Sequence, residues 1–127
     1  MPAQPVPSLR IETINMDCAD AAAMAAFYSR LLGWEVTWRD DDFFLMRDPS
    51  GGLGLLFQER AEYRAPVYPE QPGGQDKMIH LDIRVDDLDA AVAHALAAGG
   101  RLAEYQGRED LRVMLEPAGH PFCLFTI

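Results

Sequence analysis

The feature that most constrains the fold is an internal repeat that spans roughly half of the chain. The matched pairs are Asp20 and Asp87, Ala23 and Ala90, and Gly33 and Gly100 at an offset of 67, then Pro49 and Pro117, Gly51 and Gly119, and Phe57 and Phe125 at 68. An offset that holds over about forty residues with a single slip is typical of a duplicated module. The sequence therefore predicts two copies of one structural unit.

The second copy shows the unit most clearly. From residue 79 to residue 85 apolar and polar side chains alternate strictly, which is typical of a strand with one buried face. A helical pattern follows, with Asp87 as its N-cap and a glycine pair at its end. Because the helix must cover the apolar face of the strand, His80, Asp82 and Arg84 are expected on the opposite, wetter face.

Each copy is predicted to run strand, helix and three strands, which gives an α+β fold. The expected strands are 9–16, 34–39, 43–47 and 53–58 in the first copy and 79–85, 101–106, 111–116 and 122–127 in the second, with helices starting at Asp20 and Asp87. The predicted organisation is a flexible tail over residues 1–8 and one domain over 9–127. That domain consists of module one (9–59), a linker (60–77) and module two (78–127). Two such modules are expected to form a curved mixed sheet with the helices outside.

Composition narrows the classes of partner. The 127 residues carry a net charge of −9, which disfavours nucleic acid and anionic membranes, because both require clustered basic residues. No apolar run approaches the ~20 residues needed to span a bilayer. The start of the chain lacks the features of a signal peptide, and Cys18 and Cys123 have no metal or redox spacing, so reduced thiols in a cytoplasmic protein are expected.

The repeated pattern resembles the vicinal oxygen chelate superfamily, in particular its glyoxalase-like branch. The resemblance covers about residues 9–127 and rests on FYSRLLGWEV (27–36) and DPSGG (48–52) in the first copy, with Asp20, and on HLDIRVDDLDAA (80–91) and EPAGHPFCLF (116–125) in the second. It implies a cup of two strand–helix–three-strand modules and a homodimer.

Metalloenzymes of that superfamily place one metal ligand on the first strand and one on the last strand of each module. By resemblance these positions are Thr13, Leu55, His80 and Cys123. A catalytic divalent metal requires about three nitrogen or oxygen ligands and an open position. His80 and Cys123 alone do not supply them, so no metal cofactor is expected.

One small-molecule cavity in the cup is predicted. Its expected lining residues are Thr13, Asn15, Leu55, Phe57, His80, Asp82, Arg84 and Cys123. His80 is the best candidate for a general base, or else a pocket histidine inherited from a metal-binding ancestor. Asp82 and Arg84 would clamp a polar ligand or pair with each other. Cys123, between apolar neighbours, is expected to be a small core residue rather than a nucleophile.

Two functional classes follow. The first is a protein that binds a small organic molecule without a catalytic metal, as bleomycin-resistance members of the superfamily do. The second is an enzyme of glyoxalase type, a lyase, isomerase or dioxygenase, with or without a metal. The incomplete ligand set favours the first class, and His80 keeps the second open.

Overall fold

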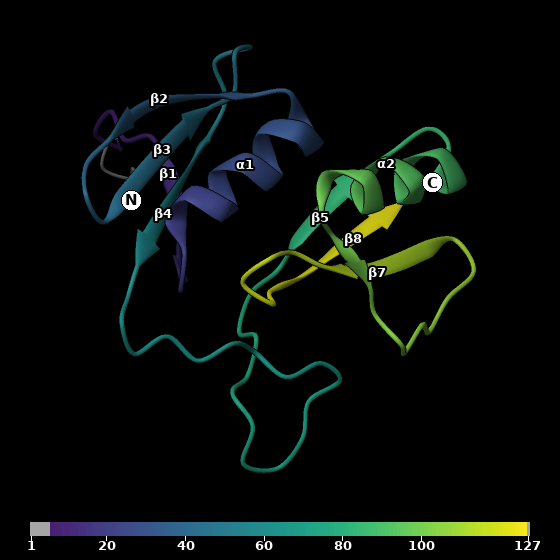
Figure 1. Cartoon of the computed structure of the whole chain (residues 1–127). Coiled ribbons are helices and arrows are strands. Elements are labelled where there is room, and N and C mark those ends of the chain that lie inside the picture. Colours follow the sequence, from purple (N-terminus) through teal and green to yellow (C-terminus); the bar gives the residue numbers. More distant parts are fainter. Residues whose placement is uncertain (1–5, 127) are drawn as a thin grey trace, which may run out of the picture.

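The predicted α+β fold with two tandem modules is confirmed by the computed structural model, which describes residues 6–126 (Figure 1). Most of the predicted tail over residues 1–8 lies outside the described part. The elements of module one are β1 (Thr13–Cys18), α1 (Ala21–Leu32), β2 (Glu35–Arg39), β3 (Phe43–Arg47) and β4 (Gly54–Glu59). Those of module two are β5 (Leu81–Arg84), α2 (Leu88–Ala98), β6 (Arg101–Leu102), β7 (Leu111–Leu115) and β8 (Pro121–Phe125).

Both helices begin as the repeat predicts, and α2 ends one residue before the glycine that the repeat matches to Gly33. The carboxylate of Asp20 accepts a hydrogen bond from the backbone of Ala23, and Asp87 caps α2 in the same way. Each cap satisfies a backbone N–H that has no partner within the helix. Gly33 and Gly99 end the helices in the left-handed region, with φ of 74° and 111°, where a side chain is disfavoured.

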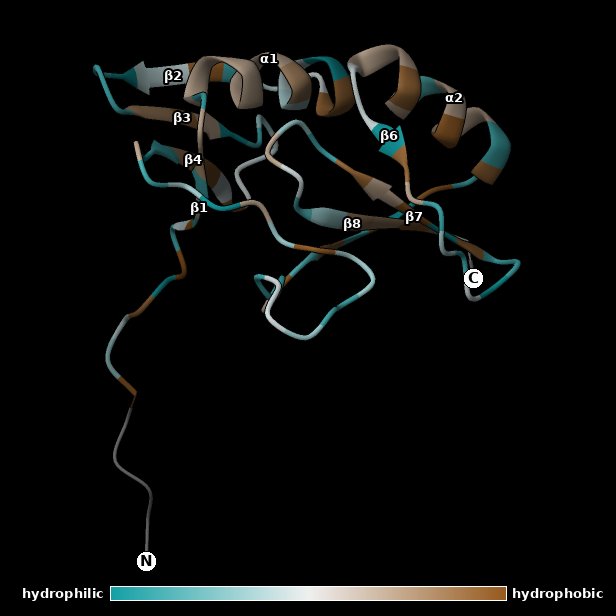
Figure 2. Cartoon of the chain, turned by 60° about the horizontal axis from the view of Figure 1, so that its bottom comes forward, coloured by the Kyte–Doolittle hydropathy of each residue, from teal (hydrophilic) through white to brown (hydrophobic). Residues whose placement is uncertain are grey.

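The modules have the same sheet topology. The strand order is β1-β4-β3-β2 in one sheet and β5-β8-β7-β6 in the other, and in each the first strand runs parallel to the last. Among residues 6–126 no strand ladder joins β1 to β5, so the curved surface consists of two adjoining four-stranded sheets. Both helices cover the same side of the sheets, and the segment between the modules crosses the other side (Figure 2).

Three strands are shorter than the sequence predicts. The strand expected at 79–85 is reduced to β5, and Ile79, predicted on its buried face, is exposed. Residues 9–12 form no strand, and Leu9 and Ile11 are exposed. The strand expected at 101–106 is reduced to the two residues of β6. Here the amide side chain of Gln106 bonds to the backbones of Ala103 and Val113 and takes the place of further ladder bonds.

A shared aromatic core holds the modules together. Phe27 and Tyr28 of α1 lie edge to face, with ring centroids 4.9 Å apart. Tyr28 stacks on Phe57 of its own module, and Phe27 lies 5.7 Å from Phe122 of module two. Because α1 also contacts α2, burial of these rings holds the two modules together.

Candidate functional site

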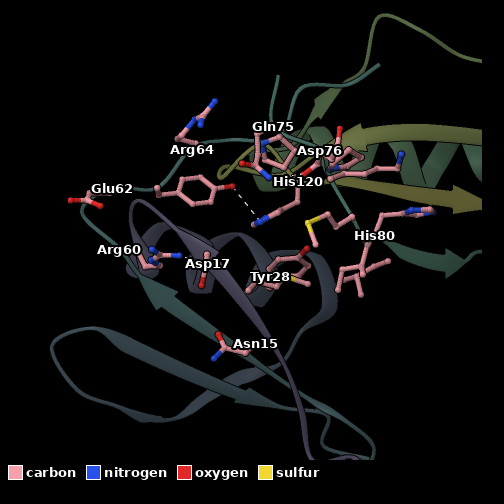
Figure 3. Close-up of a pocket in the computed structure, with 18 residues that line it drawn as sticks. Asn15, Asp17, Tyr28, Arg60, Glu62, Arg64, Gln75, Asp76, His80 and His120 are labelled. Carbon is pink, nitrogen blue, oxygen red and sulfur yellow. Dashed lines mark hydrogen bonds and ion pairs between the residues drawn. The ribbon is translucent and has the colours of Figure 1, made fainter. Parts of the chain in front are cut away.

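A cavity of about 530 Å³ lies between the two modules, under the segment that connects them (Figure 3). Its walls come from β1, α1, the connecting segment, the approach to β5 and the turn before β8. The lining residues are Asn15, Met16, Asp17, Tyr28, Arg60, Glu62, Tyr63, Arg64, Pro66, Gln75, Asp76, Lys77, Met78, Ile79, His80, Leu81, His120 and Pro121. This volume is within the usual range for small-molecule sites.

The alternation predicted for β5 agrees with the structure. Leu81, Ile83 and Val85 pack against the core, whereas His80, Asp82 and Arg84 are exposed. The His80 ring lies 3.1 Å from a carboxylate oxygen of Asp82. Asp82 therefore pairs with His80 rather than with Arg84.

Only some of the predicted lining residues meet in one cavity. Asn15 and His80 line the inter-module cavity. Cys123 lines a second cavity of about 280 Å³ on the sheet of module two, and His80 borders that cavity as well. Thr13, Asp82 and Arg84 line neither of the two. The single cavity predicted from the sequence is therefore two spaces that meet at His80.

The prediction that Leu55 and Phe57 line the cavity is wrong. Both side chains are in the core on the helix side of β4, with Phe57 fully buried and stacked on Tyr28 at 5.3 Å. Strand alternation then turns Leu56 and Gln58 to the opposite face. Gln58 accepts a hydrogen bond from the side chain of Asn15 there.

The error arises from where the repeat slips. Asn15 pairs with Leu56 in one sheet, and Asp82 pairs with Cys123 in the other, so Leu56 is the structural equivalent of Cys123 at the offset of 67. Module one carries one additional residue between the turn at Gly51 and β4. The match of Phe57 with Phe125 at 68 is therefore a coincidence of residue type.

The superfamily's metal positions, corrected for this slip, read Thr13, Leu56, His80 and Cys123. A leucine side chain cannot bind a metal, so among the four positions His80 and Cys123 are the usual metal-binding residue types. Three possible ligand atoms lie within 4.8 Å of one another, one each from His80, Asp82 and Cys123. These three come from one module only, so the residues present do not fit the superfamily's metal site, which draws on both.

A second group of polar residues in and behind the cavity wall was not predicted from the sequence. Glu116, directly after β7, is fully buried. Its Oε1 accepts a hydrogen bond from the backbone N–H of His120 and lies 2.9 Å from Nδ1 of the same ring. The other ring nitrogen lies 3.3 Å from the hydroxyl of Tyr63, the contact dashed in Figure 3. The only indication in the sequence is the glutamate–histidine pair four residues apart.

The Glu116 carboxylate alters the acidity of its neighbours. Burial, followed by this charge, raises the pKa of Cys18 to about 12. The same two causes raise the pKa of Tyr28 and of Tyr63. The thiol and both phenols are therefore neutral at physiological pH.

The charged residues around the cavity include both acidic and basic side chains. Arg60 forms an ion pair with Asp17, with 3.0 Å between nitrogen and oxygen. Lys77 pairs with Glu70 and also lies over the ring of Tyr68. Because both pairs are neutral overall, recognition in the cavity depends on hydrogen bonds and shape more than on net charge.

The model of the family described as "Glyoxalase-like domain" matches residues 13–125. The chain belongs to the glyoxalase-like domain family. Within the curated proteins, this glyoxalase-like domain is 30% identical over 93 residues to "Putative glyoxylase CFP32" of Mycobacterium bovis and of Mycobacterium tuberculosis. The match covers 70% of this chain and 33% of those proteins, so the chain spans about one third of their length.

Solved structures support the same fold. A glyoxalase/bleomycin resistance protein/dioxygenase family enzyme from Burkholderia phytofirmans is 21% identical with a TM-score of 0.68, over 94% of this chain and 99% of that one. A lactoylglutathione lyase from Agrobacterium tumefaciens is 18% identical with a TM-score of 0.61, over 95% and 96%. At these identities the likeness shows the fold alone, and any chemistry has to be argued from the site.

The glyoxalase-like domain has two helices in its described part, and neither is long and apolar enough to cross a membrane.

Proposed function

We propose that this glyoxalase-like domain binds a small organic molecule in the cavity between its modules, without a catalytic metal ion. The observation that carries the proposal is the cavity itself. It combines an apolar wall, which includes Met16 and Leu81, with a few convergent polar groups, among them Asn15, His80 and His120. Such a mixture is typical of small-molecule sites.

We propose no catalytic metal because of the residues at the four ligand positions of the superfamily. Thr13 and Leu56 replace two of the four superfamily ligands, which leaves His80 and Cys123, both from module two. Cys18 and Cys123 are free and buried, which supports a reducing compartment such as the cytoplasm.

A homodimer is part of the proposal. Met78 and Ile79 border the cavity and remain largely exposed, as does Trp38 on the edge strand β2. Exposed apolar groups of this kind are often covered in an assembly. A second chain over Met78 and Ile79 would also narrow the cavity.

Binding is tested by screening a library of small organic molecules against the purified chain with thermal shift and calorimetry. The Asn15→Trp variant places a large ring in the cavity, whereas Thr37→Trp adds the same ring on exposed β2 of the same sheet. Hits should lose most of their affinity for the Asn15 variant and keep it for the Thr37 variant. Equal affinity for both variants would refute binding in this cavity.

A second candidate function is an enzyme of glyoxalase type, a lyase, isomerase or dioxygenase. The observation that favours it is His80, which borders both cavities and is bonded to Asp82, an arrangement suited to a general base. Turnover of methylglyoxal–thiol adducts that is lost in His80→Gln would support the enzyme.

A further inference from the structure

The buried Glu116 is unusual for this position of the fold. The equivalent residue of module one, Asp48, is only partly buried, and its carboxylate accepts hydrogen bonds from Ser50 within its own turn. The turn therefore does not require a carboxylate in the core. Burying one costs several kcal/mol unless it is paired. The bond between Glu116 and His120 provides that pair.

The hydrogen-bond directions around His120 are determined by its neighbours. The Tyr63 hydroxyl has one hydrogen and donates it to the carbonyl of Ala118 at 2.7 Å. Its oxygen can therefore only accept from His120, so Nε2 of His120 carries a proton. One further proton lies between Nδ1 and Oε1 of Glu116, which leaves the pair with zero net charge whichever atom holds it.

The contact between Nε2 and Tyr63 is the weakest link of this network. At 3.3 Å it is longer than the other bonds of the group, which measure 2.7–2.9 Å. His120 and Tyr63 both line the inter-module cavity. A ligand oxygen that reaches Nε2 can replace this contact while the Tyr63 hydroxyl keeps its bond to Ala118.

One atom of the network still lacks a partner. Among the buried side-chain nitrogen and oxygen atoms of residues 6–126, Oε2 of Glu116 is the one without a hydrogen-bond partner. Burial raises the pKa of the Tyr28 phenol, which also lines the cavity, and this carboxylate next to it raises that pKa further. The carboxylate thus lies beside Tyr28 of α1 and His120 of the turn before β8, and through His120 it is linked to Tyr63 of the connecting segment.

We propose that His120 is a hydrogen-bond donor for a carbonyl or carboxylate oxygen of the ligand, and that Glu116 is the positioning residue that keeps the proton on Nε2. The ligand class is a small aromatic ketone or carboxylic acid, because Tyr28 and Met16 offer an apolar wall beside this donor. The inference rests on the proposed function, since it assigns the chemistry of the same cavity.

The test uses phenylacetate and acetophenone as probes, with ethylbenzene as a probe of similar shape that lacks an oxygen acceptor. Binding is followed by chemical-shift changes of the backbone amides of Asn15 and Met16. The oxygen-bearing probes should bind at least about tenfold more tightly than ethylbenzene, the effect of one charge-assisted hydrogen bond.

Variants distinguish a role of Glu116 in positioning His120 from a role in folding alone. His120→Gln and Glu116→Gln should both abolish the preference for an oxygen acceptor, the second because a glutamine leaves Nε2 without its proton. Tyr63→Phe should keep the preference or increase it, because the competing acceptor is gone. His94→Gln changes a histidine bonded to the backbone of Leu31 and should behave like the unmodified chain. Urea unfolding of each variant verifies that it is folded.

Equal binding of all three probes, or a preference that persists in His120→Gln, would overturn the inference and leave the proposed binding function intact. If no probe shifts the amides of Asn15 and Met16, the inference also fails. The library screen with the Asn15→Trp variant then decides the proposed function separately.

Discussion

Replacing Phe57 with alanine is expected to destabilise the fold by about 3–5 kcal/mol, the range for deleting a fully buried phenylalanine ring. Phe57 has no exposed surface, and its ring is stacked on Tyr28 with 13° between the planes. The deletion therefore leaves a cavity in the core beneath α1. At about 1–3 kcal/mol per molar urea, the unfolding midpoint should fall by at least about 1 M.

Leu56→Ala is the matched control, because Leu56 is the next residue of β4 and faces the other side of the sheet. Leu56 is half-buried, so its loss should cost about half of the ~2–5 kcal/mol typical of a buried leucine. Urea unfolding followed by circular dichroism measures both values. If Leu56→Ala costs as much as Phe57→Ala, the assignment of Phe57 to the core and Leu56 to the open face is refuted.

Four further predictions follow from the structure. Stability is expected to be fully present below pH ~9 and to decline as the pH rises from there towards about 12, because Cys18 ionises more readily in the unfolded chain than in the folded one; Cys18→Ala should remove this part of the pH dependence in urea titrations. Protein purified without chelator should contain far less than one equivalent of zinc, nickel, manganese or iron by elemental analysis, and a stoichiometric metal lost in His80→Ala would contradict the donor-set argument. Light scattering should give the mass of two chains, and a monomer at micromolar concentration would refute the dimer. Arg84→Ala should leave ligand affinity within a factor of about two, because Arg84 lines neither cavity; a tenfold loss would return it to the site.

Much of the fold could be predicted because the same sequence pattern occurs in both modules. The caps at Asp20 and Asp87 recur at the offset of 67, and each helix ends at a glycine, Gly33 in α1 and Gly99 in α2. The alternation in β5 likewise placed His80 on the open face.

The face of β4 could not be read correctly, because a slip of one residue reverses every side chain of a strand. Residues 53–58 are nearly all apolar, so their pattern does not reveal which face is buried. The ladder between β1 and β4 resolves the register through the pairing of Asn15 with Leu56.

The Glu116–His120–Tyr63 network depends on contacts between distant parts of the chain. Tyr63 lies 57 residues before His120, in a segment without periodicity. The sequence places Glu116 only at the end of a predicted strand over 111–116 and gives its carboxylate no role. Only the packing of module two against α1 shows that this carboxylate is in the core.

The most direct test of the inter-module site is a crystal structure of the chain with the tightest hit of the library screen. The ligand is expected between β1 and the turn before β8, with an oxygen within about 3 Å of His120 Nε2. A ligand bound elsewhere on either sheet, with the Tyr63–His120 contact unchanged and the cavity filled only by solvent, would contradict the proposal.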